Sequence, residues 1–233
     1  MPNPAKAEEY FRKGLNSSNY KEKEKHYQAA VKENPLHANA LINLAIAQHK
    51  NQKDGDATET FQKLVKLDQS DKLKLDNLQK LLVLYHLGLI FEKEGRYDDA
   101  ISYYRKATAK YEDSHSTKSI WRVTSSIAQG GEEDLYSKAL TNCGSCYKRK
   151  NDLAAAAGCF EKSITFWPFD PLVWFNYGVV NFDRQKYDIA FYCFLLAAQN
   201  GFMQQASGHL SNLEQRGIRP KRPNLDLPSD FPP

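Results

Sequence analysis

The sequence lacks the features that mark most specialised classes of protein. In 233 residues it has four cysteines and no long apolar run, so neither a disulfide scaffold nor a membrane span of about 18–20 apolar residues is indicated. Its first residues contain no apolar stretch of the kind that secretory signals need, which favours a cytoplasmic location. A net charge of +4 is too small for the basic footprint of a dedicated nucleic-acid binder.

Motifs that carry catalysis or hold cofactors are missing as well. The sequence has no glycine-rich phosphate loop, no G-x-S-x-G elbow and no H-E-x-x-H helix, and its six histidines are scattered. Cys143 and Cys146 form a C-x-x-C, but no second pair with metal-ligand spacing follows, so we interpret the cysteines as small packed side chains. We therefore expect no enzyme activity, no metal and no cofactor.

What the sequence does contain is an internal repeat. Four Gly or Ala residues are each followed, twelve positions later, by Ala. The pairs are Ala45 and Ala57, Gly88 and Ala100, Gly144 and Ala156, and Gly178 and Ala190. Small residues in such pairs let two antiparallel helices approach closely, and an aromatic residue one helical turn after each Ala lies on the same helix face. A single hairpin of this kind cannot bury its apolar stripe, whereas stacked hairpins can.

This pattern resembles the tetratricopeptide repeat, a helix–turn–helix of about 34 residues. The fifth unit shows the motif with Trp174, Tyr177, Gly178, Ala190 and Phe194. The resemblance implies an all-α fold, an α-solenoid of about five repeats in a right-handed superhelix with a C-terminal capping helix. The expected boundaries are repeats at 4–37, 38–71, 81–114, 137–170 and 171–204, a cap at 205–218 that completes the solenoid of residues 1–218, insertions at 72–80 and 115–136, and a tail at 219–233.

Parts of the chain depart from this period. The first unit is degenerate, because Gly14 is displaced. Segment 72–80 has leucines at helical spacing, so we expect it to lengthen the next helix at its start. Segment 115–136 is either a helix extension with a loop or a contact for a partner. The Pro-rich tail 219–233 should be extended or flexible, either as a plain terminus or as a short ligand for another domain or for this protein's own groove.

In the tetratricopeptide family the first helix of each pair lines a concave groove that binds a segment of a partner protein. Carried over residue by residue, this implies a groove lined by Ile42, Asn43, Ile46 and Lys50, by Tyr85, His86, Leu89 and Lys93, by Lys138, Asn142, Lys148 and Arg149, and by Phe175, Asn176, Val179 and Phe182. The sixth position of each unit reads Asn43, His86, Asn142 and Asn176. An Asn carboxamide offers a donor and an acceptor together, which matches the N–H and C=O of an extended backbone.

The groove residues also bear on the kind of partner. The two-carboxylate clamp of co-chaperone repeats is absent, which disfavours acidic chaperone C-terminal tails as ligands. We predict a non-enzymatic protein–protein interaction adaptor or scaffold, without membrane association, that binds an extended or helical peptide segment. Two alternatives stay open: a structural subunit that uses its convex face, the 115–136 insertion or the tail, and RNA binding through basic groove residues, which the mild charge disfavours.

Overall fold

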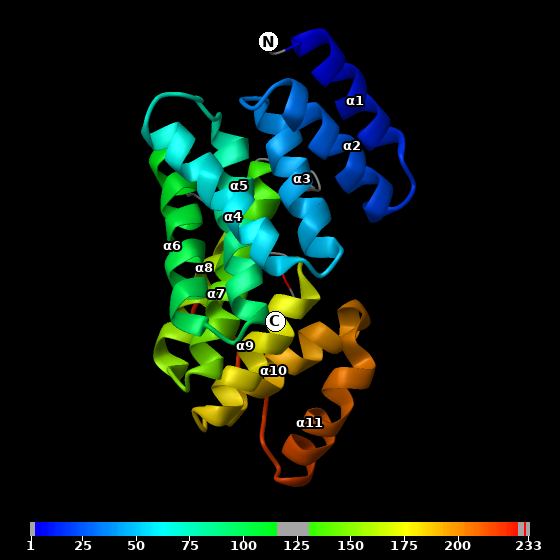
Figure 1. Ribbon diagram of the computed structural model, residues 1–233. Helices are drawn as coiled ribbons and strands as arrows, with labels where there is room; N and C mark the ends of the chain where they lie inside the picture. The colour runs from blue at the N-terminus through cyan, green and yellow to red at the C-terminus, as the bar shows by residue number, and fades with distance from the viewer. Residues whose placement is uncertain (1–2, 116–130, 228–230, 232–233) are drawn as a thin grey trace. The chain divides into compact units, whose positions relative to one another are not determined.

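The chain folds as a succession of helix pairs. The computed structural model describes residues 3–115, 131–227 and 231, and these contain helices and no strands. The pairs, shown in Figure 1, are α1 (Pro4–Asn16) with α2 (Tyr20–Glu33), α3 (Ala38–Lys50) with α4 (Asp54–Gln69), α5 (Asn77–Lys93) with α6 (Tyr97–Ser114), α7 (Glu132–Arg149) with α8 (Leu153–Phe166), and α9 (Pro171–Asp183) with α10 (Tyr187–Ala197). A π-helical turn, η2 (Ala198–Phe202), then leads into α11 (Met203–Gln215). The predicted all-α repeat architecture is confirmed.

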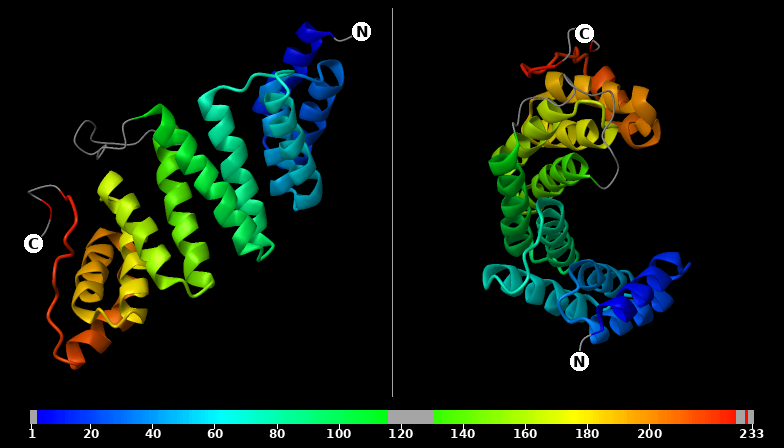
Figure 2. Two further views of the ribbon diagram at one scale, coloured as in Figure 1. Left: turned by 90° about the vertical axis from the view of Figure 1, so that its left-hand side faces the viewer. Right: turned by 90° about the horizontal axis from the view of Figure 1, so that it is seen from above.

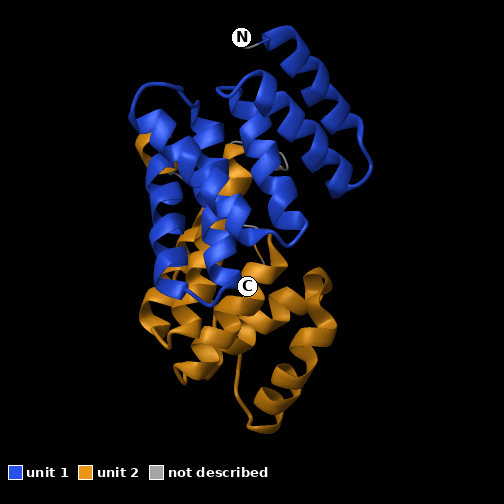
Figure 3. Cartoon of the chain, viewed as in Figure 1, with its two compact units in different colours: residues 1–110 blue, residues 111–233 orange. Residues whose placement is uncertain are grey.

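The helices form two compact units, coloured separately in Figure 3. Unit 1 comprises residues 1–110 and so contains α1 to α5 and most of α6. Unit 2 comprises residues 111–233 and contains the end of α6, helices α7 to α11 and the tail. In unit 2 the last turn of α6 is held by aromatic packing, because Tyr111 stacks on Tyr136 of α7 with ring centroids 4.4 Å apart.

A glycine lies under an aromatic ring where the helices of a pair meet. A Cβ built on Gly88 of α5 would lie 2.5 Å from the ring of Tyr104 in α6, and one on Gly178 of α9 would lie 2.9 Å from the ring of Phe194 in α10. Both rings are fully buried. The small residues of the repeat are therefore required by the close approach of paired helices, as the sequence pattern predicts.

The first pair makes the same contact from a glycine that lies nearer the end of its first helix. A Cβ on Gly14 of α1 would lie 2.4 Å from the ring of Tyr27 in α2. These residues are thirteen positions apart, whereas the glycine and aromatic residue of the later pairs are sixteen apart. Gly14 lies two residues before the end of α1, whereas Gly88 lies five residues before the end of α5, and both turns have three residues. The displaced glycine of the degenerate unit thus keeps its packing role, and the difference is taken up within the first helix.

The turns of the later pairs share one backbone conformation. A residue with positive φ follows the small residue of the repeat by seven positions: Gln52 (63°), Gly95 (74°), Asn151 (62°) and Gln185 (60°). This left-handed region is easy for Gly and tolerated by Asn, but it costs about 1–2 kcal/mol for other residues. The repeat therefore imposes the turn geometry even where the local residue, Gln, does not favour it.

Both expected insertions overlap a helix start. Helix α5 begins at Asn77 behind a capping box, in which Asp76 accepts from Gln79 N and Gln79 accepts from Asp76 N. The end of segment 72–80 therefore belongs to α5, and its beginning is a connection. Helix α7 begins at Glu132, within segment 115–136, and has acidic residues in its first turn, where the helix dipole favours them. Residues 116–130 lie outside the described part of the chain.

The C-terminal end of the repeat array is covered as predicted. Ala206, Leu210 and Leu213 of α11 are buried against a cluster that includes Phe194 of α10, so α11 is the capping helix. After it, the chain has no regular secondary structure over residues 218–227 and runs beside α9 and α10, as the red segment in Figure 2 shows. The described residues 219–227 of the tail thus have no regular secondary structure.

Candidate functional site

The sixth position of each repeat lies away from the contact between paired helices. It precedes the small residue of the repeat by two positions, and two residues turn a helix by about 200°. The side chains at this position are all partly exposed: Asn43 on α3 and His86 on α5 in unit 1, and Asn142 on α7 and Asn176 on α9 in unit 2. We call the surfaces around them the inner-helix faces of unit 1 and unit 2.

His86 has the most unusual environment on the inner-helix face of unit 1. Its ring stacks on Phe61 of α4, with centroids 5.8 Å apart and an interplanar angle of 8°. Its Nδ1 is buried and has no hydrogen-bond partner among the described residues. Burial first, and then the charges of neighbouring His49 and Lys50, lower the pKa of His86 to about 4. The ring is therefore neutral at physiological pH, and we assign its proton to Nε2.

An acidic residue that the sequence did not single out neutralises part of this face. Asp54, at the start of α4, accepts hydrogen bonds from Lys93 Nζ on α5 and from His49 Nδ1 on α3, each at 2.6 Å. Burial acts to raise the pKa of Asp54, but the hydrogen bonds from Lys93 and His49 outweigh it and lower that pKa. Lys93 is thus tied to a carboxylate, and it offers a ligand less charge than its position suggests.

The other predicted residues of unit 1 differ in accessibility. Ile42 is 3% exposed and supports the face from below. Asn43 Nδ2 donates to Asn39 O at 2.8 Å, and its Oδ1 accepts no hydrogen bond from the described residues. Lys50 is exposed and makes no ion pair within the described part of the chain. Half-buried apolar side chains complete the face: Ile46, Tyr85 and Leu89.

In unit 2 the basic residues of the inner-helix face lie on α7. Lys138 pairs with Asp134 one turn earlier, at 2.7 Å. Lys148 and Arg149, in the last turn, make no ion pair within the described residues. Of the three predicted basic residues on this face, the two without an ion pair therefore lie at the C-terminal end of α7.

The apolar residues of this face on α9 are partly covered by the capping helix. Phe175, Val179 and Phe182 are half-buried and pack against the cluster that α11 closes. His209 of α11 lies between them, with its ring 5.5 Å from that of Phe182 and 6.1 Å from that of Phe175. The sequence pattern carried no signal for this histidine, because its position depends on how α11 docks.

The metal-ligating and thiol side chains of the described residues form no further site of their own. No group of three or more His, Cys, Asp or Glu side chains in the described part of the chain is arranged to hold a metal ion. All four cysteines are free thiols, and Cys143, Cys146 and Cys193 are buried within helices. Among the described helices, none combines the length and apolar character needed to cross a bilayer.

Comparison with known families agrees with this architecture. Two family models of the tetratricopeptide repeat match, one over residues 5–72 and one over residues 81–114. The chain is a tetratricopeptide-repeat protein. Proteins of this family generally act through protein interactions, and the described helix pairs are the units from which such proteins are built.

Curated relatives share only part of their length with this tetratricopeptide-repeat protein. It is 27% identical over 149 residues to the Protein STIP1 homolog of Dictyostelium discoideum, a stretch that covers 62% of this chain and 26% of that protein. It is 36% identical over 59 residues to a TPR repeat-containing protein of Schizosaccharomyces pombe, which covers 25% of this chain and 7% of the other. The chain thus spans about a quarter or less of these relatives.

Solved structures show the same fold at low sequence identity. The MamA protein superposes with a TM-score of 0.63 at 18% identity, covering 87% of this chain and 94% of its own. Pseudomonas aeruginosa pilF gives 0.63 at 17% identity, with coverages of 91% and 90%. YrrB, described as a TPR protein with an unusual peptide-binding site, gives 0.59 at 16% identity, with coverages of 83% and 84%. At these identities the likeness establishes the fold.

Proposed function

We propose that this protein is a non-enzymatic adaptor whose inner-helix faces bind a segment of a partner protein. The observation that supports this most directly is on unit 1, where Asn43 Oδ1 and His86 Nε2 lie on neighbouring first helices without partners among the described residues. One is an acceptor and the other a donor, so together they complement the N–H and C=O groups of a peptide backbone.

The surrounding side chains suggest the composition of that segment. Ile46, Tyr85 and Leu89 are half-buried apolar contacts beside the two polar atoms. Of the two predicted lysines on this face, Lys93 is bound to Asp54, whereas Lys50 pairs with no carboxylate among the described residues. We therefore expect a segment with bulky apolar residues and one acidic residue, rather than a strongly acidic one.

The same ion pairs argue against nucleic acid as the ligand. Phosphate binding needs free Lys and Arg side chains along the track of the backbone. Lys93 and Lys138 each lie within 2.7 Å of a carboxylate oxygen, which reduces the positive potential of both faces. The carboxylate clamp for acidic chaperone tails is also missing from the sequence, so we propose that such tails are not the ligand.

The test is a binding measurement that treats the two units separately. Peptides are first selected on the wild-type protein from a displayed random library, and their affinities are measured by fluorescence anisotropy. The unit 1 variant carries Asn43→Ala and His86→Phe, and the second change keeps the ring stacked on Phe61. The unit 2 variant carries Asn142→Ala and Asn176→Ala.

At least one of these variants should weaken binding about tenfold, because each lost hydrogen bond is worth about 0.5–1.5 kcal/mol and 1.4 kcal/mol is tenfold in affinity. A matched control with Asn16→Ala and Asn212→Ala, at exposed helix positions, should bind as the wild type does. If neither pair changes the affinity while circular dichroism shows intact helices, the inner-helix faces are not the binding surface.

A further inference from the structure

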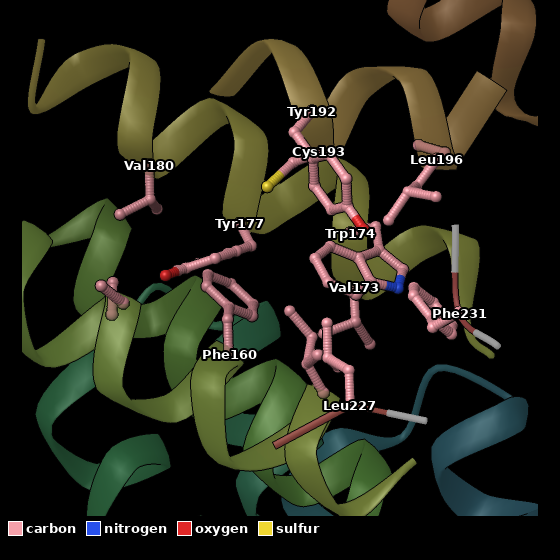
Figure 4. Packing of buried hydrophobic residues seen from close by; sticks show 14 residues of the cluster. Phe160, Val173, Trp174, Tyr177, Val180, Tyr192, Cys193, Leu196, Leu227 and Phe231 are labelled. Carbon is pink, nitrogen blue, oxygen red and sulfur yellow. The ribbon is translucent and has the colours of Figure 1, made fainter. Parts of the chain in front are cut away.

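The C-terminal tail occupies a hydrophobic surface of unit 2 whose residues differ from those predicted for the groove. Its buried anchors are Leu227 and Phe231, each 9% exposed. Phe231 stacks on Trp174 with centroids 5.7 Å apart and an interplanar angle of 28°, and Figure 4 shows both anchors beside the side chains of α9 and α10. We call the surface beneath these anchors the tail site; it is formed by Val173, Trp174, Tyr192 and Leu196.

The tail is attached as a ligand would be. A backbone hydrogen bond from Lys221 N to Asp188 O, at 2.9 Å, ties its start to α10. Farther along, Leu227 and Phe231, four positions apart, enter the apolar cluster, and the half-buried Leu225 packs against it. Against their burial stands the entropy lost in ordering a segment without regular secondary structure. The balance of these two contributions sets how readily the tail leaves the site.

The tail leaves part of the adjoining apolar surface uncovered. Phe169, in the connection between α8 and α9, is 51% exposed although its ring lies 6.0 Å from that of Phe231. The ring of Trp167 lies 5.0 Å from it on the same connection. A ligand that covered Phe169 as well as the tail site would bury more apolar surface than the tail does.

We propose that the tail site is a second docking surface, used by an extended segment of another protein that competes with the chain's own tail. The fitting segment has a leucine in the place of Leu227, an aromatic residue four positions later in the place of Phe231, and a further apolar residue that covers Phe169. A second copy of this chain is the weaker competitor, because its tail brings no added contact. It would also have to displace a tethered tail whose effective concentration is on the order of millimolar.

The experiment opens the site in the full chain and probes it with the tail sequence itself. In the variant Leu227→Asp, Phe231→Asp the anchors become charged, so the tail should leave the site. A fluorescent peptide of residues 219–233 should then bind this variant at least tenfold more tightly than the wild type, whose site is occupied. Fusing one additional Phe to the peptide, spaced to reach Phe169, should tighten binding further, and Phe169→Ala should remove that gain.

Matched controls separate docking from non-specific adhesion. The variant Pro220→Asp, Asn224→Asp adds two charges at exposed tail positions and should behave as the wild type. A probe that itself carries the two Asp substitutions should not bind. Equal binding of the unmodified probe to wild type and opened variant, or no binding to either, would overturn the proposal.

A second form of the experiment covers the case in which the opened variant does not fold. A protease site inserted after Gly217, in an exposed turn, lets the wild-type tail be cut after folding. Exchange of the cut tail for the labelled peptide supports the proposal, whereas unfolding on cleavage, or a tail that never exchanges, shows it to be part of the core. A wild-type dimer in sedimentation that the opened variant loses would assign the site to a second copy and overturn the choice of partner.

Discussion

Replacing Gly178 with Ala tests the close helix approach on which the repeat depends. The new Cβ would lie 2.9 Å from two ring atoms of Phe194 and 3.2 Å from Cβ of Cys193. The ring has little freedom to move, because Phe194 is fully buried and stacked on His209 with centroids 4.4 Å apart. Overpacking of this kind costs about 1–3 kcal/mol, which exceeds the gain of about 0.5–1 kcal/mol from replacing a helical Gly by Ala.

Gly158 on α8 supplies the matched control within the same unit. It lies inside a helix and is exposed, and a Cβ built on it meets nothing within 4 Å. Gly158→Ala should therefore raise the free energy of unfolding by about 0.5–1 kcal/mol, and Gly178→Ala should lower it by about 1–2 kcal/mol. Urea denaturation followed by circular dichroism measures both changes. If both variants were stabilised alike, α9 and α10 would not be in the close contact described here.

Further predictions concern a turn and the histidine stacked on Phe61. Gln185→Gly should raise the free energy of unfolding by about 1 kcal/mol, because it removes a Gln from the left-handed region. Gly95→Ala should lower that free energy by a similar amount. An unchanged urea midpoint in both variants would contradict the shared turn geometry. His86, with its pKa lowered to about 4, takes up a proton more readily unfolded than folded. Protonation of His86 therefore leaves the free energy of unfolding unchanged above pH 6.5. As the pH falls from 6.5 toward 4, it lowers that free energy by up to about 3 kcal/mol. His86→Gln should flatten that part of the stability–pH curve, and parallel curves for wild type and variant would show that the histidine is not buried in its neutral form.

The sequence was a good guide to the helix pairs because their packing is local and repeated. The spacing of Gly178, Ala190 and Phe194 reflects one contact that recurs along the chain, so the pattern is visible without any long-range information. Pro35 and Pro168 lie just after the second helices of their pairs, since α2 ends at Glu33 and α8 at Phe166. Turn residues do not show the pattern in the same way, because Gln52 and Gln185 adopt a backbone that their side chains do not favour.

The electrostatics of the candidate surfaces could not be read from the repeat in this way. Asp54 starts a second helix and lies outside the positions assigned to the groove, yet it binds Lys93, which is thirty-nine residues away. The stacked position of the His86 ring likewise depends on Phe61 from the neighbouring pair. Docking of the tail depends on Trp174, because the ring of Phe231 stacks on it. No local sequence pattern predicts that contact. Each of these contacts joins two residues whose separation in the sequence is not set by the repeat.

Binding of polypeptide to the inner-helix faces can be followed residue by residue in a nuclear magnetic resonance titration. A peptide selected on the wild-type protein is added to the labelled full chain, and the shifts of the backbone amides are followed. We expect the largest shifts on α3 and α5 around Asn43 and His86, on α7 and α9 around Asn142 and Asn176, or on both faces. Shifts confined to the second helices of the pairs, or the absence of any saturable shift, would contradict it.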